Sequence, residues 1–137
     1  MNVQDPEFYK ELLEVFIMES QEHIDTMKKC LNELQQKSES DDKNDAYEEI
    51  KRAAHSLKGA ARTVGFENLE SVGYGFEKLF GRMWNSDIIV SDEIARNLTT
   101  AFGSLEKMVA ALKKEGKETG DNHEVLNIIE KVEHSLS

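Results

Sequence analysis

The chain contains a single proline, Pro6, in 137 residues. Proline interrupts helices, because its ring clashes with the preceding turn and its nitrogen has no hydrogen to donate. From residue 7 onward, long uninterrupted helices are therefore allowed. Only the segment 87–90, Asp-Ile-Ile-Val, has the composition of a strand, and it is too short to pair usefully. The sequence predicts an all-α protein.

Apolar residues recur at helical spacing in five segments of the chain. We expect helices over residues 6–36, 45–64, 68–85, 92–115 and 122–136. Short polar loops separate these segments, and short loops make consecutive helices antiparallel neighbours. The expected architecture is an antiparallel four-helix bundle with an additional short C-terminal fifth helix, and the length fits a single domain over residues 1–137.

Residues that cap helices mark three of the expected N-termini. Asp5 precedes Pro6 and is the expected N-cap of the first helix. Asp45, with Glu48 three residues later, has the spacing of a capping box for the second helix. Ser91 or Asp92 is the expected cap of the fourth helix.

The charge and cysteine content restrict the class of protein. The formal net charge is -10, so the basic surface typical of nucleic-acid binding is absent, and anionic membranes are disfavoured partners. No apolar run approaches the roughly 18 residues that a membrane span needs. Residues 1–5 lack the pattern of a signal peptide, and Cys30 is the only cysteine. We expect a cytoplasmic protein without disulfides or membrane insertion.

Other side chains give weaker signals. The histidines His23, His123 and His134 do not have metal-ligand spacing with one another or with Cys30, so no metal is expected. Trp84, next to a helix end, is expected to be half-buried. The methionines at helical spacing are expected in the core, namely Met18, Met27, Met83 and Met108.

His55 is the residue of the expected second helix with the clearest chemical interest. A rotation of about 100° per residue places the apolar residues of this helix opposite His55. That expected buried stripe comprises Ala46, Ile50, Ala53, Leu57, Ala61 and Val64. The outward face around His55 carries four cations in a chain of net charge -10, namely Lys51, Arg52, Lys58 and Arg62. From this pattern alone, a solvated helix face with an incidental histidine is the commoner explanation.

Several motifs resemble those of a known family. The segment 54–61, Ala-His-Ser-Leu-Lys-Gly-Ala-Ala, resembles the H-x-x-K-G signature of histidine phosphotransfer (HPt) domains. Residues 16–23 resemble the F-x-x-E-x-x-E stretch of the phosphotransfer domain that opens CheA-type chemotaxis kinases. In that family Gly-Phe follows the second helix, as at residues 65–66, and a glutamate lies 22 residues after the histidine, as Glu77 does. One departure is Tyr74, where many CheA-type domains have a second histidine.

The resemblance implies a role for each matched residue. His55 would accept a phosphoryl group on Nε2, and Glu77 would bind the proton on the other ring nitrogen. Lys58, one turn from His55, would neutralise phosphoryl oxygens. Partner binding would involve Gly59, which leaves room beside the imidazole, and the cations Lys51, Arg52 and Arg62.

The chain has no glycine-rich nucleotide-binding motif, so the resemblance implies a phosphoryl carrier that is not an enzyme by itself and needs no cofactor. The expected partners are a histidine kinase catalytic domain, or a phosphorylated receiver, and a response-regulator receiver domain. We expect the phosphotransfer domain of a CheA-like kinase. Two alternatives remain open: a free-standing phosphotransfer protein, and a non-catalytic helical adaptor in which His55 is incidental.

Overall fold

The computed structural model describes residues 5–136, which form five helices and no strand. The prediction of an all-α fold is confirmed, and each helix boundary lies within one residue of the expected one. Residues 1–4, which the expectation about a signal peptide concerns, lie outside the described range. The helices are α1 (Pro6–Gln35), α2 (Asn44–Val64), α3 (Glu67–Asn85), α4 (Asp92–Glu115) and α5 (His123–Ser135).

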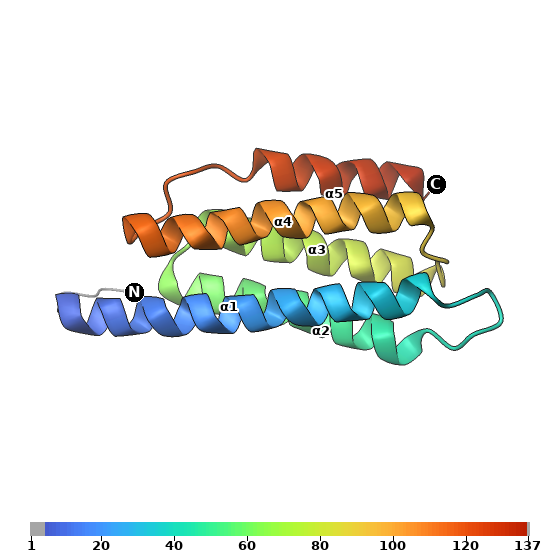
Figure 1. The fold of residues 1–137 in the computed structure, drawn as a ribbon, viewed down its shortest axis with the longest axis horizontal. Coiled ribbons are helices and arrows are strands. Elements are labelled where there is room, and N and C mark those ends of the chain that lie inside the picture. The colour runs from blue at the N-terminus through green and yellow to red at the C-terminus, as the bar shows by residue number, and fades with distance from the viewer. Residues whose placement is uncertain (1–4, 137) are drawn as a thin grey trace.

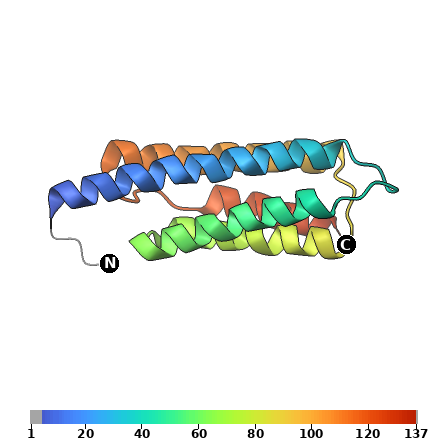
Figure 2. The same ribbon diagram turned by 90° about the horizontal axis from the view of Figure 1, so that it is seen from below.

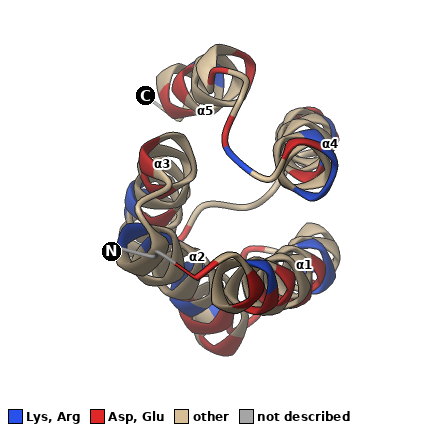
Figure 3. Cartoon of the chain, turned by 90° about the vertical axis from the view of Figure 1, so that its left-hand side faces the viewer, with Lys and Arg blue, Asp and Glu red and all other residues tan. Residues whose placement is uncertain are grey.

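The five helices alternate in direction along the bundle (Figure 1). α1 packs against α2 and α4, and α2 packs against α3. Figure 2 shows α1 and α4 as one layer and α2 and α3 as the other. Viewed along the bundle, α5 lies between α3 and α4 and covers the side that these two helices leave open (Figure 3). The fifth helix therefore completes the bundle around a shared core.

The core is apolar and includes aromatic contacts between helices. Phe76 of α3 stacks on Phe80 and contacts Phe102 of α4, with ring centroids 5.6 and 5.3 Å apart. Met27 and Met83 are buried as expected, but Met18 is 58% exposed, so its expected core position is wrong. The reason is helical rotation, since two residues after buried Phe16 the helix has turned by about 200°.

The expected helix caps are partly confirmed. The side chain of Asp5 accepts a hydrogen bond from the backbone of the first turn of α1, and Ser91 does the same for α4. The predicted capping box of α2 is wrong. α2 begins at Asn44, so Asp45 already lies in the first turn, and Glu48 forms an ion pair with Arg52 instead.

Lys43 joins the two loops at one end of the bundle. Its side chain is buried, and Nζ donates to the Asp41 carbonyl at 3.2 Å and to Asp87 Oδ2 at 3.3 Å. Beside it, the Tyr47 hydroxyl donates to the Ile88 carbonyl at 2.6 Å. The sequence predicted only a short polar loop between the first two helices, and it gave no sign of this buried cation directly before α2.

Glu118 joins the loops at the other end of the bundle. Its carboxylate accepts hydrogen bonds from the backbone nitrogens of Asn68 and Leu69, at 3.2 and 2.9 Å. The residue at the N-cap position of α3 is Phe66, which has no side-chain acceptor. Glu118, from the α4–α5 loop, therefore supplies the missing cap and the negative charge that a helix N-terminus favours.

Candidate functional site

Small residues of α3 bring it close to α2 on both sides of Glu77. A Cβ atom built on Gly73 would lie 2.8 Å from the backbone nitrogen of Lys58. One built on Gly81 would lie 3.4 Å from Cε of Lys51. Glu77 lies one turn from each glycine and faces His55. We call this row the α2–α3 seam, defined by Lys51, His55 and Lys58 of α2 and by Gly73, Glu77 and Gly81 of α3.

His55 and Glu77 form the central contact of the seam. His55 Nδ1 lies 2.6 Å from Glu77 Oε2, and the imidazole side chain is 63% exposed whereas the glutamate side chain is 17% exposed. An ionised carboxylate can only accept hydrogen bonds, so Nδ1 carries the proton. The neutral ring then has its lone pair on Nε2, to which no described residue donates. An exposed nucleophilic nitrogen results.

Lys58 binds the other oxygen of the same carboxylate. Its Nζ donates to Glu77 Oε1 at 2.7 Å, and its side chain is 21% exposed. Nζ also lies 5.7 Å from the ring centroid of Tyr74, within the range of a cation–π contact. The structure therefore brings His55, Glu77 and Lys58 together, with Lys58 directed at the glutamate.

The environment of Glu77 keeps it ionised. Partial burial raises the pKa of the Glu77 carboxyl, but the hydrogen bonds from Lys58 and His55 lower it by more, and the pKa lies below its ordinary value. The carboxylate is therefore an acceptor throughout the neutral pH range. It holds the imidazole in one tautomer and one orientation.

The other sequence-predicted partner-binding residues differ in their surroundings. Arg52 forms an ion pair with Glu48, and the Arg62 Nε donates to a glutamate of α3, Glu70, at 2.8 Å. Lys51 forms no salt bridge within the described part of the chain. Gly59 is exposed, and a Cβ atom there would meet nothing within 4 Å.

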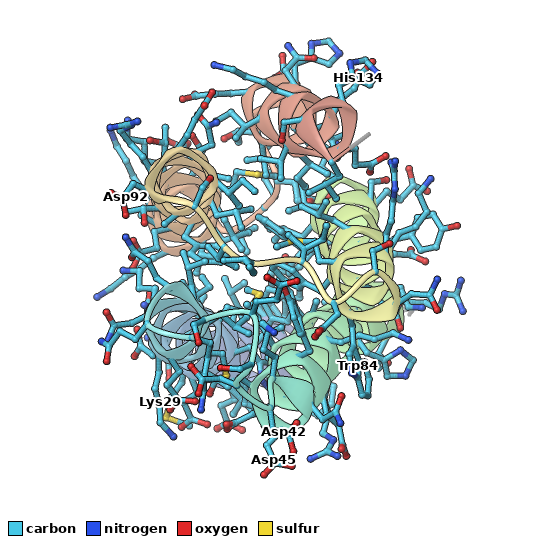
Figure 4. All side chains as sticks on the ribbon, turned by 90° about the vertical axis from the view of Figure 1, so that its right-hand side faces the viewer. Lys29, Asp42, Asp45, Trp84, Asp92 and His134 are labelled. Carbon is cyan, nitrogen blue, oxygen red and sulfur yellow. The ribbon has the colours of Figure 1, made fainter. Side chains whose placement is uncertain are left out.

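Sequence reasoning missed the contribution of α3 to this surface, apart from Glu77. The ring of Tyr74 lies near two cations. The Nζ atoms of Lys58 and Lys78 are 5.7 and 5.8 Å from its centroid. Trp84 lies near the C-terminal end of α3 (Figure 4). Its indole N–H donates a hydrogen bond to Asn44 of α2 at 2.9 Å. Trp84 is half-buried as expected. The sequence signal for this contribution of α3 is that Lys78 directly follows Glu77.

Three further findings concern other kinds of site. Within residues 5–136, no group of three His, Cys, Asp or Glu side chains could hold a metal ion. None of the described helices combines the length and apolar character needed to span a bilayer. Cys30 is buried, and burial together with Glu49 raises the pKa of its thiol to about 12, so it is a poor nucleophile.

Comparisons with known proteins identify the family of this chain. The sequence model of the Hpt domain matches residues 11–115. Chemotaxis protein CheA of Listeria monocytogenes is 27% identical over 90% of this chain. The proteins of the same name from Halobacterium salinarum and Bacillus subtilis are each 34% identical, over 88% and 82% of this chain. The chain spans 19%, 17% and 16% of the lengths of these three relatives. No solved structure matches it.

Proposed function

Because this chain belongs to the Hpt domain family, we propose that it carries a phosphoryl group on His55 between the proteins of a two-component phosphorelay. The observation that carries the proposal is the contact between His55 and Glu77. It leaves Nε2 exposed and free of described hydrogen-bond partners, and in the neutral ring this nitrogen carries the lone pair. An imidazole in that state is a good phosphoryl acceptor at neutral pH.

In the first step, Nε2 attacks the γ-phosphorus of ATP held by the catalytic domain of a histidine kinase. The new N–P bond forms as the bond between phosphorus and the ADP oxygen breaks, and ADP leaves with that electron pair. The ring gains positive charge, which the Glu77 carboxylate stabilises through the Nδ1 proton. Glu77 is thus the residue that orients and activates His55.

In the second step, a carboxylate oxygen of a receiver aspartate attacks the phosphorus. The O–P bond forms, the N–P bond breaks, and His55 returns to its neutral form with the proton still on Nδ1. Lys58 is the cation nearest to the phosphoryl group in this scheme. Its flexible side chain can turn from Glu77 toward the phosphoryl oxygens. Gly59 presents no side chain beside the imidazole, so a partner can approach closely.

The similarity to chemotaxis protein CheA supports a more specific role. We propose that the chain acts as the phosphotransfer domain of a CheA-like chemotaxis kinase in the cytoplasm, with ATP chemistry supplied by a kinase catalytic domain. Lys51, Arg52 and Arg62 are the cations of α2 proposed to contact partners. A purely structural adaptor would have no need for a carboxylate aligned on Nδ1, which favours the carrier.

The experiment is phosphorylation by a CheA-type catalytic domain with labelled ATP. The wild type should gain a label that is stable in base and labile in acid, as expected for a phosphohistidine. The His55→Gln variant should gain none. His134→Gln, a change at another exposed histidine, is the matched control and should be labelled like the wild type. Undiminished label on His55→Gln would overturn the proposal.

A further inference from the structure

We propose that Lys78 is a second cation for the phosphoryl group on His55, and that Tyr74 is the positioning residue that holds Lys78 beside Lys58. The inference rests on the function proposed above and adds two residues of α3 to the same site. It is carried by the fixed backbone of Tyr74, by the two ammonium groups next to its ring, and by the lack of an anion paired with Lys78.

The backbone on both sides of Tyr74 is packed against other helices. A Cβ atom on Gly73 would lie 2.8 Å from the backbone nitrogen of Lys58 in α2. One on Gly75 would lie 3.3 Å from two leucine and isoleucine side-chain carbons of α5. Because α2 and α5 pack against these neighbouring positions, α3 has little room to shift or rotate here. The ring of Tyr74 therefore projects from a fixed point, although the residue is 53% exposed.

The exposed ring of Tyr74 lies beside two ammonium groups. Nζ of Lys58 is 5.7 Å and Nζ of Lys78 is 5.8 Å from the ring centroid, both within the range of a cation–π contact. Lys58 extends from α2 and also donates to Glu77, whereas Lys78 directly follows Glu77 on α3. One ring thus attracts two cations that repel each other, next to the carboxylate that binds His55.

Lys78 has no carboxylate partner, in contrast to Lys58. It forms no salt bridge with any residue in the described range 5–136. It borders a groove toward α5 that also contains Glu130 and Glu133, and it pairs with neither of them. A lysine side chain is long and flexible, so an ammonium group that is held only by an aromatic ring can move toward a new anion. Lys78 is therefore available when the phosphoryl group arrives.

The charges of the site explain the need for a second cation. A phosphoryl group carries roughly -1.5 to -2 at neutral pH. It would join the Glu77 carboxylate, which is already ionised. Lys58 alone would have to serve both anions, and Lys78 supplies the second positive charge. A chain of net charge -10 provides no general positive field, so the compensating cations have to be local.

The test uses phosphoramidate, a small phosphoryl donor that needs no kinase. Nε2 of His55 attacks the phosphorus, the new N–P bond forms, and ammonia leaves with the electron pair of the bond that breaks. Phosphorus NMR then follows the pH titration of each phosphohistidine. The signals of His55 and His123 are those absent from His55→Gln and His123→Gln. His123 is the internal control, since its side chain is 81% exposed at the start of α5.

Lys78→Gln removes the second cation and keeps most of the side-chain length. We expect the pKa of phosphorylated His55 to rise by about 0.3 or more, because a nearby cation disfavours the uptake of a proton. Tyr74→Leu should have the same effect, whereas Tyr74→Phe keeps the ring and should behave like the wild type. Lys131→Gln, which removes an exposed lysine of α5 without a described salt bridge, is the charge control and should leave the pKa unchanged.

The rate of labelling gives a second measure. Phosphoramidate is an anion, so Lys78→Gln should slow the labelling of His55 about two- to fivefold at low salt, and Lys131→Gln should not. The His123 signal should titrate identically in all four variants.

Each part of the proposal has a result that would overturn it. An unchanged pKa in Lys78→Gln, or an equal change at His123, would refute the role of Lys78. Equal values for Tyr74→Leu and Tyr74→Phe would refute that of Tyr74. Label on His55 from phosphoramidate but none from a kinase would contradict the proposed function and leave this inference standing. A His55 that phosphoramidate does not label would overturn both.

Discussion

Gly73 of α3 lies so close to Lys58 of α2 that a methyl group on its α-carbon would be 2.8 Å from the Lys58 backbone nitrogen and 2.9 Å from its Cα. Both neighbours are backbone atoms, which cannot turn aside. The distance between the two helices is therefore set at this point, one turn from the carboxylate that binds His55. We therefore expect the contact between His55 and Glu77 to depend on the absence of a side chain at Gly73.

Gly73→Ala should separate the two helices and weaken the contact between Glu77 and His55. We expect a loss of about 1–3 kcal/mol in the free energy of unfolding, as for other overpacked interiors, and slower phosphorylation of the folded protein. Gly103→Ala on α4 is the control, since a Cβ there meets nothing within 4 Å. That variant should be as stable as the wild type or more so by up to about 1 kcal/mol. Denaturant titration and label transfer would measure both effects. Wild-type rates in Gly73→Ala would disprove the role of the spacing.

Glu77→Gln should slow phosphorylation of His55 by roughly 10- to 100-fold, because the amide keeps the shape but loses the charge that stabilises the ring. The unfolding free energy should change by at most about 1 kcal/mol, since Lys58 can turn to solvent. Nitrogen NMR of the neutral His55 ring should show the proton on Nδ1 in the wild type and a larger fraction on Nε2 in the variant. Glu70→Gln, which removes the partner of Arg62, is the control and should leave the tautomer unchanged. The same tautomer ratio in Glu77→Gln would argue against this contact in solution.

The stability of the α1–α4 contact should depend on pH through Glu106. Hydrogen bonds from Lys28 and Gln21 lower the pKa of Glu106 and outweigh the opposing effect of its partial burial. Because the folded-state pKa is depressed, this stabilisation is complete above the unfolded value of about 4.3 and is lost as the pH falls through the folded value.

Glu106→Gln should therefore be less stable than the wild type by at most about 1 kcal/mol at pH 7, since the pair is partly exposed. The difference should shrink as the pH falls through the folded-state pKa of Glu106, because the wild-type carboxyl becomes protonated there. Urea unfolding curves at several pH values would measure it. A difference that stays constant with pH would show that the charge of Glu106 is not involved.

Lys43 should be more important for stability than its place in a polar loop suggests. Lys43→Ala removes the buried stem and the hydrogen bonds to Asp41 and Asp87, and we expect a loss of about 2–4 kcal/mol. Lys43→Met keeps most of the volume and should lose less. Asp87→Asn should cost under about 1 kcal/mol, because Asp87 is 64% exposed. Thermal unfolding of the three variants gives the order. If Asp87→Asn lowered the stability as much as Lys43→Ala does, the stabilisation would come from the ion pair alone.

The sequence by itself determined the helices, and it predicted His55 as the phosphoryl acceptor. A single proline and the helical spacing of apolar residues located all five segments, and the capping side chains of Asp5 and Ser91 marked the starts of α1 and α4. These signals act within a few residues of one another. The angular positions of residues around α2 predicted that His55 lies opposite the buried stripe, and the His55 side chain is exposed in the structure. Two buried residues of α2 were missed, Tyr47 and Ala54, since the helix is covered by neighbours over a wider arc than one stripe.

Only the tertiary structure decided which charges meet. Lys58 binds Glu77, Arg62 binds Glu70, and Lys51 lies across Gly81, all between α2 and α3. The apolar spacing of residues 123–135 predicts that α5 is a helix but not where it packs. Its place between α3 and α4 follows from the opening that these two helices leave. Such contacts depend on the distance, rotation and register of two helices. Those quantities are set by packing across the whole interface, including the close approach at Gly73, and no local periodicity encodes them.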